Sequence, residues 1–264
     1  MDSTPHGAAI TAEALGVKGP RGWVFRDVDV AAPPGSLVAL EGPSGSGRTC
    51  LLLTLTGRMR PTSGRAEVGD LPLPGRMAAV RRTSALAHVP GVAELDPALT
   101  VAEHLRERGL LQRRFGGPPL TWLRPRTGRD AARARTDTAL AATGLDLTAL
   151  PKGAATAVRE LERLDALRLS LALALIGRPR LIAVDDTDLK LPDAEREQAW
   201  ALLRSLTGAG TSVLAVCSQA PPGALVVPTA PDARRPTART TPARDTAGHG
   251  RKGATDALAE TGRA

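Results

Sequence analysis

The sequence has few cysteine and aromatic residues and no long apolar run. Its 264 residues include two cysteines, three tryptophans, two phenylalanines and no tyrosine. Cys50 and Cys217 lie far apart in apolar surroundings, so we expect buried thiols in a reducing compartment and no disulfide framework. No apolar run approaches the ~18 residues of a transmembrane helix, and residues 1–15 lack the basic and apolar segments of a signal peptide. We therefore expect a cytoplasmic protein, or one that attaches to a membrane only through partners.

Positive charge is abundant in the sequence but is not concentrated in one segment. The formal net charge is +8, which could indicate binding to nucleic acid or to an anionic membrane surface. Residues 229–264 carry seven Arg or Lys and four Asp or Glu, which accounts for +3 of the charge. Elsewhere, basic residues are interspersed with acidic ones. A role with nucleic acid is therefore supported by charge alone, and we do not expect a nucleic-acid partner.

Residues 42–49 match the phosphate-binding loop pattern G-x-x-x-x-G-K-[ST] at every defined position except one. The glycines let successive backbone N–H groups turn toward phosphate oxygens at a helix N-terminus, and Thr49 would supply a hydroxyl ligand to Mg²⁺. Arg48 replaces the lysine, so the charge remains but its carrier is a bulky planar fork. The residues predicted to bind the nucleotide are Gly42, Pro43, Ser44, Gly45, Ser46, Gly47, Arg48, Thr49 and Cys50.

The segments on either side of this loop support the prediction. Residues 36–41 form a short apolar run that is typical of a buried strand, and residues 50–56 read as an apolar helix that stops at Gly57. The alternative is a chance match in a chain with 27 glycines. A strand, a glycine loop and a helix in this order are the context that the motif requires, so we predict a P-loop fold.

Two carboxylates follow a second apolar strand far downstream. Residues 181–184 are wholly apolar, and Asp185 and Asp186 come directly after them. Asp185 would hold Mg²⁺ through water, and Asp186 would sit where a base orients an attacking water. The alternative is that both residues simply end the strand and cap the next element. We predict the metal role for Asp185, whereas for the catalytic role of Asp186 the two interpretations stay open.

The remaining pattern predicts one α/β domain over residues 1–228, followed by a disordered basic tail over 229–264 that is rich in Pro, Thr, Ala, Arg and Gly. Short apolar pieces between Gly and Pro predict antiparallel strands before the loop. Leucines three and four residues apart give the clearest helix, which ends at a Gly and a Pro. The predicted elements are antiparallel strands within 10–41, a strand at 65–70, helices within 100–145 interrupted by a loop at 116–129, a helix at 158–176, a helix at 193–207 and a strand at 212–217.

With these motifs in place, the chain resembles the ATP-binding cassette (ABC) family, the nucleotide-binding subunits of ABC transporters. The resemblance covers about residues 10–220, and the order and spacing of its pieces are more specific than any one of them. Beyond the P-loop it includes segments similar to the family's post-loop segment, its Q-loop with the following helix, and its helix with the Walker B strand. These are residues 55–64, 88–90 with 99–105, and 172–179 with 181–186.

The resemblance implies a P-loop NTPase of ABC type, with a RecA-like core sheet, an N-terminal antiparallel β subdomain and a helical subdomain over about residues 100–175. It implies ATP and Mg²⁺ as cofactors. It also implies transmembrane transporter subunits as partners, and a homodimer or a heterodimer with another ATP-binding subunit. The expected location is the cytoplasm, peripheral on the inner face of the cell membrane through those partners.

Several family positions are substituted. The Q-loop glutamine falls on Gly91 and the switch histidine on Ser218. The L-S-G-G-Q signature falls on residues 161–165, where Glu162 would place a carboxylate against the γ-phosphate held by the opposite subunit. Such like charges in a partly dry interface repel by about 1–4 kcal/mol. The Walker B glutamate is Asp186, which is one methylene shorter.

A further departure concerns the aromatic residue that stacks on adenine in the family. Its position falls near Gly19, and Trp23 is the nearby aromatic that could replace it, although a tryptophan in such a place more often packs into the core. Two functional hypotheses remain. The first is a nucleotide-binding subunit that binds ATP and hydrolyses it slowly or not at all. The second is a non-catalytic interaction or regulatory protein that keeps the fold as a scaffold.

Overall fold

The computed structural model describes residues 7–115, 125–187 and 191–229. All of these described residues belong to one compact unit. Within the predicted tail only Thr229 is described, so the rest of that prediction lies outside the described residues.

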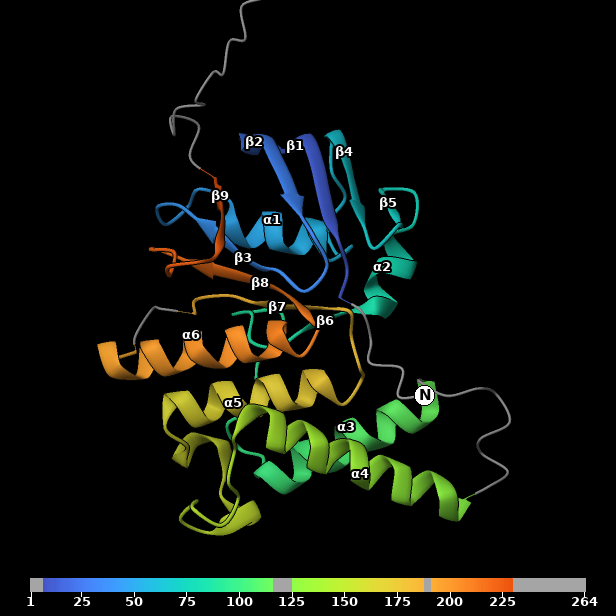
Figure 1. The fold of residues 1–264 in the computed structure, drawn as a ribbon, viewed down its shortest axis with the longest axis vertical. Helices are drawn as coiled ribbons and strands as arrows, with labels where there is room; N and C mark the ends of the chain where they lie inside the picture. Colours follow the sequence, from blue (N-terminus) through green and yellow to red (C-terminus); the bar gives the residue numbers. More distant parts are fainter. Residues whose placement is uncertain (1–6, 116–124, 188–190, 230–264) are drawn as a thin grey trace, which may run out of the picture. The chain divides into compact units, whose positions relative to one another are not determined.

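Five strands form a parallel sheet in the order β6–β7–β8–β3–β9 (Figure 1). Because each pair of neighbours runs parallel, the carboxyl ends of all five strands meet at one edge. The strands are β3 (Leu37–Glu41), β6 (Ser84–Leu86), β7 (Leu181–Val184), β8 (Ser212–Cys217) and β9 (Leu225–Pro228). The apolar runs of β3, β7 and β8 predicted those strands from the sequence. β6 and β9 went unpredicted: β6 begins at a serine and β9 ends at a proline, so neither short segment is a wholly apolar run as β7 is.

A second sheet is antiparallel and has the order β2–β1–β4–β5. Its strands are β1 (Ile10–Gly19), β2 (Gly22–Ala32), β4 (Ser63–Val68) and β5 (Pro72–Leu73). The sequence predicted several short strands before the loop, but the structure has two long ones joined by a tight turn. Register shifts and positive φ values at Ala14 (46°) and Asp27 (53°) interrupt the side-chain alternation, which is why each long strand reads as short pieces.

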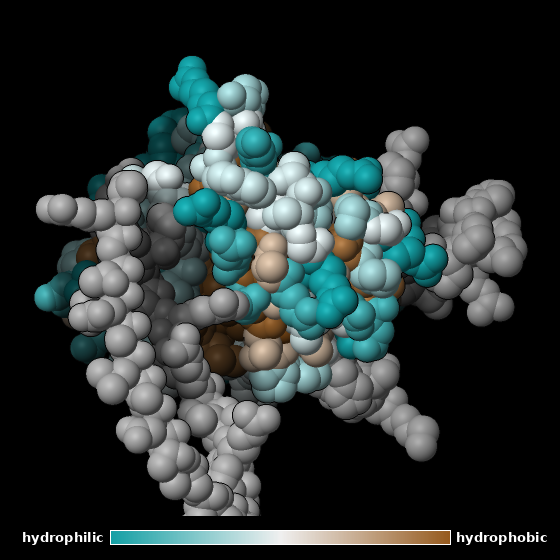
Figure 2. Space-filling model, turned by 90° about the horizontal axis from the view of Figure 1, so that it is seen from above, coloured by the Kyte–Doolittle hydropathy of each residue, from teal (hydrophilic) through white to brown (hydrophobic). Residues whose placement is uncertain are grey.

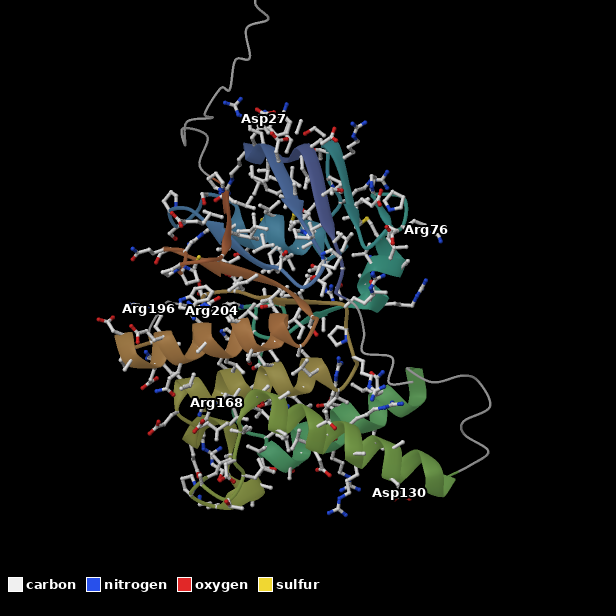
Figure 3. All side chains as sticks on the ribbon, in the orientation of Figure 1. Asp27, Arg76, Asp130, Arg168, Arg196 and Arg204 are labelled. Carbon is white, nitrogen blue, oxygen red and sulfur yellow. The ribbon has the colours of Figure 1, made fainter. Side chains whose placement is uncertain are left out.

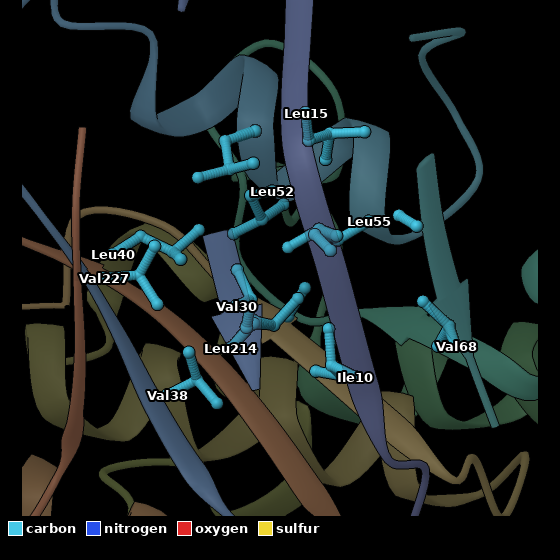
Figure 4. Close-up of a cluster of buried hydrophobic side chains, with 14 of the residues drawn as sticks. Ile10, Leu15, Val30, Val38, Leu40, Leu52, Leu55, Val68, Leu214 and Val227 are labelled. Carbon is cyan, nitrogen blue, oxygen red and sulfur yellow. The ribbon is translucent and has the colours of Figure 1, made fainter. Parts of the chain in front are cut away.

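Helix α1 (Arg48–Leu55) packs between the two sheets (Figure 1). Leu51, Leu52 and Leu55 are fully buried in a cluster that takes side chains from both sheets. Figure 4 shows Leu52 and Leu55 of α1 among Leu15 and Ile10 of β1. The helix is apolar over most of its surface because both sides are covered. Truncating one such buried leucine to alanine destabilises a protein by about 2–5 kcal/mol.

Helices α5 (Arg163–Leu175) and α6 (Asp193–Gly208) lie on the other face of the parallel sheet (Figure 1). Leu167 and Leu171 of α5 and Leu203 of α6 pack on inward-facing residues of β3, β7 and β8 in a second core cluster. The sheet is therefore covered on both faces, which explains why its strands are continuous apolar runs. The predicted helix at 193–207 corresponds to α6.

A helical part is built from α3 (Val101–Phe115), α4 (Pro125–Thr143) and α5. Two features differ from the sequence prediction. Helix α4 begins at Pro125, so the interrupting loop is shorter than 116–129; proline suits a first helical turn because its fixed φ is helical. Helix α5 begins at Arg163 rather than at Val158, since Leu161 and Glu162 have extended backbone angles. A short 3₁₀ turn over Val158–Glu160 supplied the earlier part of the helical spacing.

Two shorter helical elements complete the described fold. Helix α2 (Met77–Thr83) leads into β6 and was not predicted, and a 3₁₀ turn spans Gly153–Ala155. Thr100 caps α3: its hydroxyl accepts the Glu103 N–H at 3.3 Å, and the Glu103 carboxylate accepts the Thr100 N–H at 2.7 Å. These bonds lower the pKa of Glu103 below its usual value.

Charged side chains are spread over the surface of the described residues. The labelled residues in Figure 3 come from β2, α4, α5, α6 and the start of α2, and Arg168 and Arg196 each form an ion pair with an aspartate three residues earlier. Figure 2, seen from the end that carries β1, β2 and β4, shows hydrophilic and apolar side chains side by side.

Candidate functional site

The glycine loop occupies the position that the sequence predicted. It leaves the carboxyl end of β3 after Glu41 and runs into α1, which begins at Arg48, two residues before the expected start. β3 is flanked by β8 and β9, so the loop emerges at the edge where the carboxyl ends of all five strands meet. Ligands of open α/β sheets bind at this edge.

Gly47 shows why the loop needs glycine. It is the N-cap of α1 with φ 85°, in the left-handed region. A Cβ at this position would lie 2.4 Å from the Val24 carbonyl oxygen and 3.2 Å from the Phe25 Cβ. Gly45 is also left-handed, at φ 82°, but nothing lies within 4 Å of its Cβ position. Strand β2 therefore holds one end of the loop tightly, while the middle of the loop faces open space.

Thr229 contacts the loop and the end of the strand that leads into it. Its hydroxyl lies 2.6 Å from the Ser46 hydroxyl and 3.1 Å from the Glu41 carbonyl oxygen, and its N–H donates to that same carbonyl at 2.9 Å. A Cβ on Gly42 would come within 2.4 Å of the Thr229 hydroxyl. Thr229 is buried, so it belongs with the fold although the sequence placed it in the tail. No motif in the sequence indicated this residue.

Arg48 turns away from solvent and crosses to the neighbouring strand. It is only 8% exposed, and its Nη1 donates to the carbonyl oxygen of Cys217, the last residue of β8, at 2.6 Å. The residue after Cys217 is Ser218, which occupies the family's switch position. The guanidinium therefore ties the start of α1 to the carboxyl end of β8. The sequence marked Arg48 as unusual but gave no indication of this partner.

Thr49 and Asp185 meet as the sequence predicted for a metal site. The Thr49 hydroxyl donates to Oδ2 of Asp185 at 2.5 Å, although the two residues are 136 positions apart. Asp185 is 3% exposed, and its Oδ1 accepts the N–H of Asp186 at 2.8 Å. Its own N–H donates to the His88 carbonyl at 2.7 Å, which fixes the carboxylate at the end of β7.

The chemistry of this pair suits magnesium. A hydroxyl and a carboxylate are hard oxygen ligands, and Mg²⁺ in proteins uses one or two such groups together with waters and phosphates. Among residues 7–115, 125–187 and 191–229 there is no cluster of three His, Cys, Asp or Glu side chains suited to a metal. Cys50 lies close by: burial raises the pKa of its thiol, and the Asp185 carboxylate raises it further, so the thiol stays protonated.

Asp186 has a left-handed backbone, with φ 50°, and is half-buried. Together with Asp185 it lines a cavity of about 460 Å³ between β7, the start of α5 and the segment after β6. His88 and Arg163 also line this cavity. Sequence reasoning had not selected either one as a site residue, although His88 lies in a segment that carried the family resemblance and Arg163 in the substituted signature segment.

The positions of the family's Q-loop glutamine, signature and switch histidine lie on segments other than the glycine loop. Gly91 has φ 72° in a turn between Val89 and Ala93, and nothing lies within 4 Å of its Cβ position. Glu162 is the exposed N-cap residue of α5 and forms no side-chain capping bond. Ser218 is exposed and lines a separate hollow beside α6.

Trp23 lies one residue before Val24, whose carbonyl packs on Gly47. It is 46% exposed, so the core-packing alternative does not apply to it. The ammonium of Lys18 lies 5.9 Å from the centre of its ring, within range of a cation–π contact. An exposed indole next to the loop stays a candidate for stacking on a nucleotide base.

A family model described as ABC transporter matches residues 25–188. The chain is 30% identical over 191 residues to the Nod factor export ATP-binding protein I of Cupriavidus metallidurans, an alignment that covers 72% of the chain and 56% of that protein. It is 29% identical over 188 residues to the ribose import ATP-binding protein RbsA 2 of Rubrobacter xylanophilus, covering 71% of the chain and 34% of that protein. The chain thus spans about half or less of these relatives.

Solved structures share the fold. The ATP-binding cassette MJ0796, in a dimeric post-hydrolysis state with ADP and Pi, matches with a TM-score of 0.59 at 20% identity, covering 80% of this chain and 88% of that one. CbiO1 from Clostridium perfringens matches with a TM-score of 0.63 at 17% identity, covering 80% of this chain and 78% of that one. Among the described residues, no helix is both long and apolar enough to cross a membrane.

Proposed function

The chain belongs to the ABC transporter family, and on that premise we propose that it is an ATP-binding subunit of such a transporter. It binds MgATP at the loop over residues 42–49 and couples binding to transmembrane subunits, with slow or impaired hydrolysis. The observation that carries this proposal is the contact between Thr49 and Asp185. A loop hydroxyl and a strand-end carboxylate 2.5 Å apart at the edge of the sheet form a ready place for the metal of a nucleotide.

Binding is supported by the backbone of the loop. Gly45 and Gly47 have the left-handed angles that turn N–H groups toward an anion, and the helix that follows contributes its N-terminal dipole. Mg²⁺, when bound with the nucleotide, would neutralise phosphate charge. Thr49 and Asp185 are the residues that would hold it, and His88 positions Asp185 through its backbone carbonyl. Trp23, whose indole is exposed, would stack on the base.

Impaired hydrolysis is supported by the groups that surround the loop. Arg48 is tied to the Cys217 carbonyl, whereas the lysine at this family position is mobile. Asp186 is a candidate base beside Asp185, but its carboxylate is one methylene shorter than the family's glutamate. Gly91 and Ser218 offer no group equivalent to the glutamine and histidine. Each of these losses removes one contribution to positioning an attacking water.

The proposed assembly is a homodimer, or a heterodimer with another ATP-binding subunit, held at the inner face of the membrane by transmembrane subunits. The helical part over residues 100–175 is the region proposed to dock those subunits. Because the relatives named above serve export in one case and import in another, we propose neither a direction nor a substrate.

An inactive scaffold is the second candidate. Its specific support is that the loop's polar groups bond to one another within the chain: Ser46 to Thr229, Arg48 to Cys217, and Thr49 to Asp185. A loop stabilised in this way holds its shape without a nucleotide. The scaffold would then act through its partners alone.

Calorimetric titration of the full chain with MgATP separates these candidates. The matched control is Gly45→Asp, because this glycine faces open space and aspartate tolerates the left-handed region. We expect binding with a Kd between about 1 μM and 1 mM, the affinity range of −8 to −4 kcal/mol, and its loss in the control. Absence of heat with both proteins would contradict nucleotide binding and leave the scaffold.

A further inference from the structure

We propose that Arg48 makes the loop select nucleoside diphosphates over triphosphates. The inference rests on the proposed function, because it concerns the same loop, and it adds which phosphate chain fits best. Two observations carry it: the guanidinium of Arg48 is buried, and it is bonded to a fixed backbone carbonyl on a different strand from the loop.

The position of that carbonyl matters. Cys217 ends β8, and β8 lies between β3, which leads into the loop, and β7, which leads to Asp185. The carboxyl ends of these three parallel strands share one edge of the sheet. The guanidinium therefore reaches the end of the strand that lies between the strand leading into the glycine loop and the strand leading to Asp185. A phosphate chain that extends from the loop toward Asp185 meets the guanidinium on its way.

The guanidinium resists displacement from this place. A hydrogen bond from a charged donor to a carbonyl is about twice as strong as a neutral one, and at 2.6 Å this one is short. Arg48 is 8% exposed, so little water competes for the bond.

The shape of the two cations explains the expected preference. Arginine presents a rigid planar fork that pairs with two oxygens of one terminal phosphate. A diphosphate ends at its β-phosphate, whose three free oxygens carry the charge that this fork recognises. In a triphosphate the β-phosphate is internal, and its γ-phosphate needs the space that the fork occupies. A lysine ammonium is compact and moves along its flexible stem, so it accommodates either chain.

The test compares the ADP and ATP affinities of the full chain by calorimetry in the presence of Mg²⁺. We expect wild type to bind ADP more tightly than ATP, and Arg48→Lys to move the ADP-to-ATP affinity ratio toward ATP by about tenfold, the size expected for one charged hydrogen bond. Arg108→Lys is the matched control. Arg108 is another arginine that donates to a backbone carbonyl, that of Leu173 at 3.0 Å, in the helical part. This control leaves the ratio unchanged.

A second measurement needs no variant. Pyrophosphate and tripolyphosphate compete against a fluorescent ADP analogue on the wild-type chain, and we expect pyrophosphate to compete at lower concentration. Tighter wild-type binding of ATP than of ADP, or a ratio unchanged by Arg48→Lys, would overturn the role of Arg48 while leaving nucleotide binding intact. Binding of neither nucleotide to either protein would instead overturn the proposed function, and this inference with it.

Discussion

The phosphate loop and the start of α5 are two halves of the same family machinery, and this chain treats them differently. The loop retains left-handed glycines at Gly45 and Gly47, and a side chain at Gly47 would strike β2. The start of α5 has no glycine, and Glu162 caps the helix without a side-chain hydrogen bond. The loop is therefore part of the packing of its own domain, whereas at the start of α5 only Leu164 is buried and Glu162 and Arg163 are exposed. An exposed position that the core does not constrain is free to change.

The largest expected effect comes from Gly47→Ala. The added Cβ meets the Val24 carbonyl in a left-handed backbone, and we expect a loss of about 3 kcal/mol or more in the free energy of unfolding, measured by urea denaturation. Gly45→Ala is the matched control, because it has the same backbone strain without the contact, and it loses only about 1 kcal/mol. Equal losses in the two variants would remove the argument that β2 holds the loop.

Asp185→Asn sharpens the comparison on the loop side. The amide keeps the shape of the carboxylate but removes the charge opposite Thr49. We therefore expect the ratio of the ATP affinity with Mg²⁺ to that with EDTA to fall by about tenfold. The measurement is a pair of ATP titrations of each protein, one with Mg²⁺ and one with EDTA. Asp186→Asn serves as the control and lowers hydrolysis rather than affinity. An undiminished Mg²⁺ dependence in Asp185→Asn would move the metal site elsewhere.

Glu162→Ser tests the other side of the comparison, the start of α5. If residues 161–165 meet a nucleotide held by an opposite subunit, removing this carboxylate relieves repulsion of about 1–4 kcal/mol, so ATP-dependent dimers form at a lower protein concentration. Light scattering across a dilution series with ATP, and without it, measures the shift. Glu197→Ser, at an exposed position on α6, is the control. A dimer equilibrium that responds equally to both substitutions would argue against a charge clash at Glu162.

Thr229→Val gives the smallest expected effect. It removes the hydrogen bonds of the hydroxyl to Ser46 and to the Glu41 carbonyl, but it keeps the side-chain volume and the backbone bond to Glu41. We expect a loss of about 1 kcal/mol in the free energy of unfolding. Release of Ser46 should leave the affinity for ATP unchanged or slightly higher by calorimetry. A large fall in affinity would show that Thr229 supports the nucleotide rather than the empty loop.

Much of the fold followed from the sequence where elements are long or wholly apolar. The strands that became β3, β7 and β8 are continuous apolar runs, and the glycine pattern placed the loop between β3 and α1. The predicted start of α5 was wrong, because the helical spacing of apolar residues continues through a 3₁₀ turn that the helix does not include. The long strands β1 and β2 read as fragments because positive φ values at Ala14 and Asp27 break their alternation.

For the candidate site, the sequence by itself determined the loop, its substituted lysine position and the carboxylate partner of Thr49, because motif spacing encodes which elements they join. Only the tertiary structure decided what these groups contact. That Arg48 bonds to the Cys217 carbonyl, and that Thr229 lies beneath Ser46, depends on the lateral order of β8, β3 and β9 in the sheet. Strand order arises from packing between segments distant in the chain, and local periodicity carries no record of it.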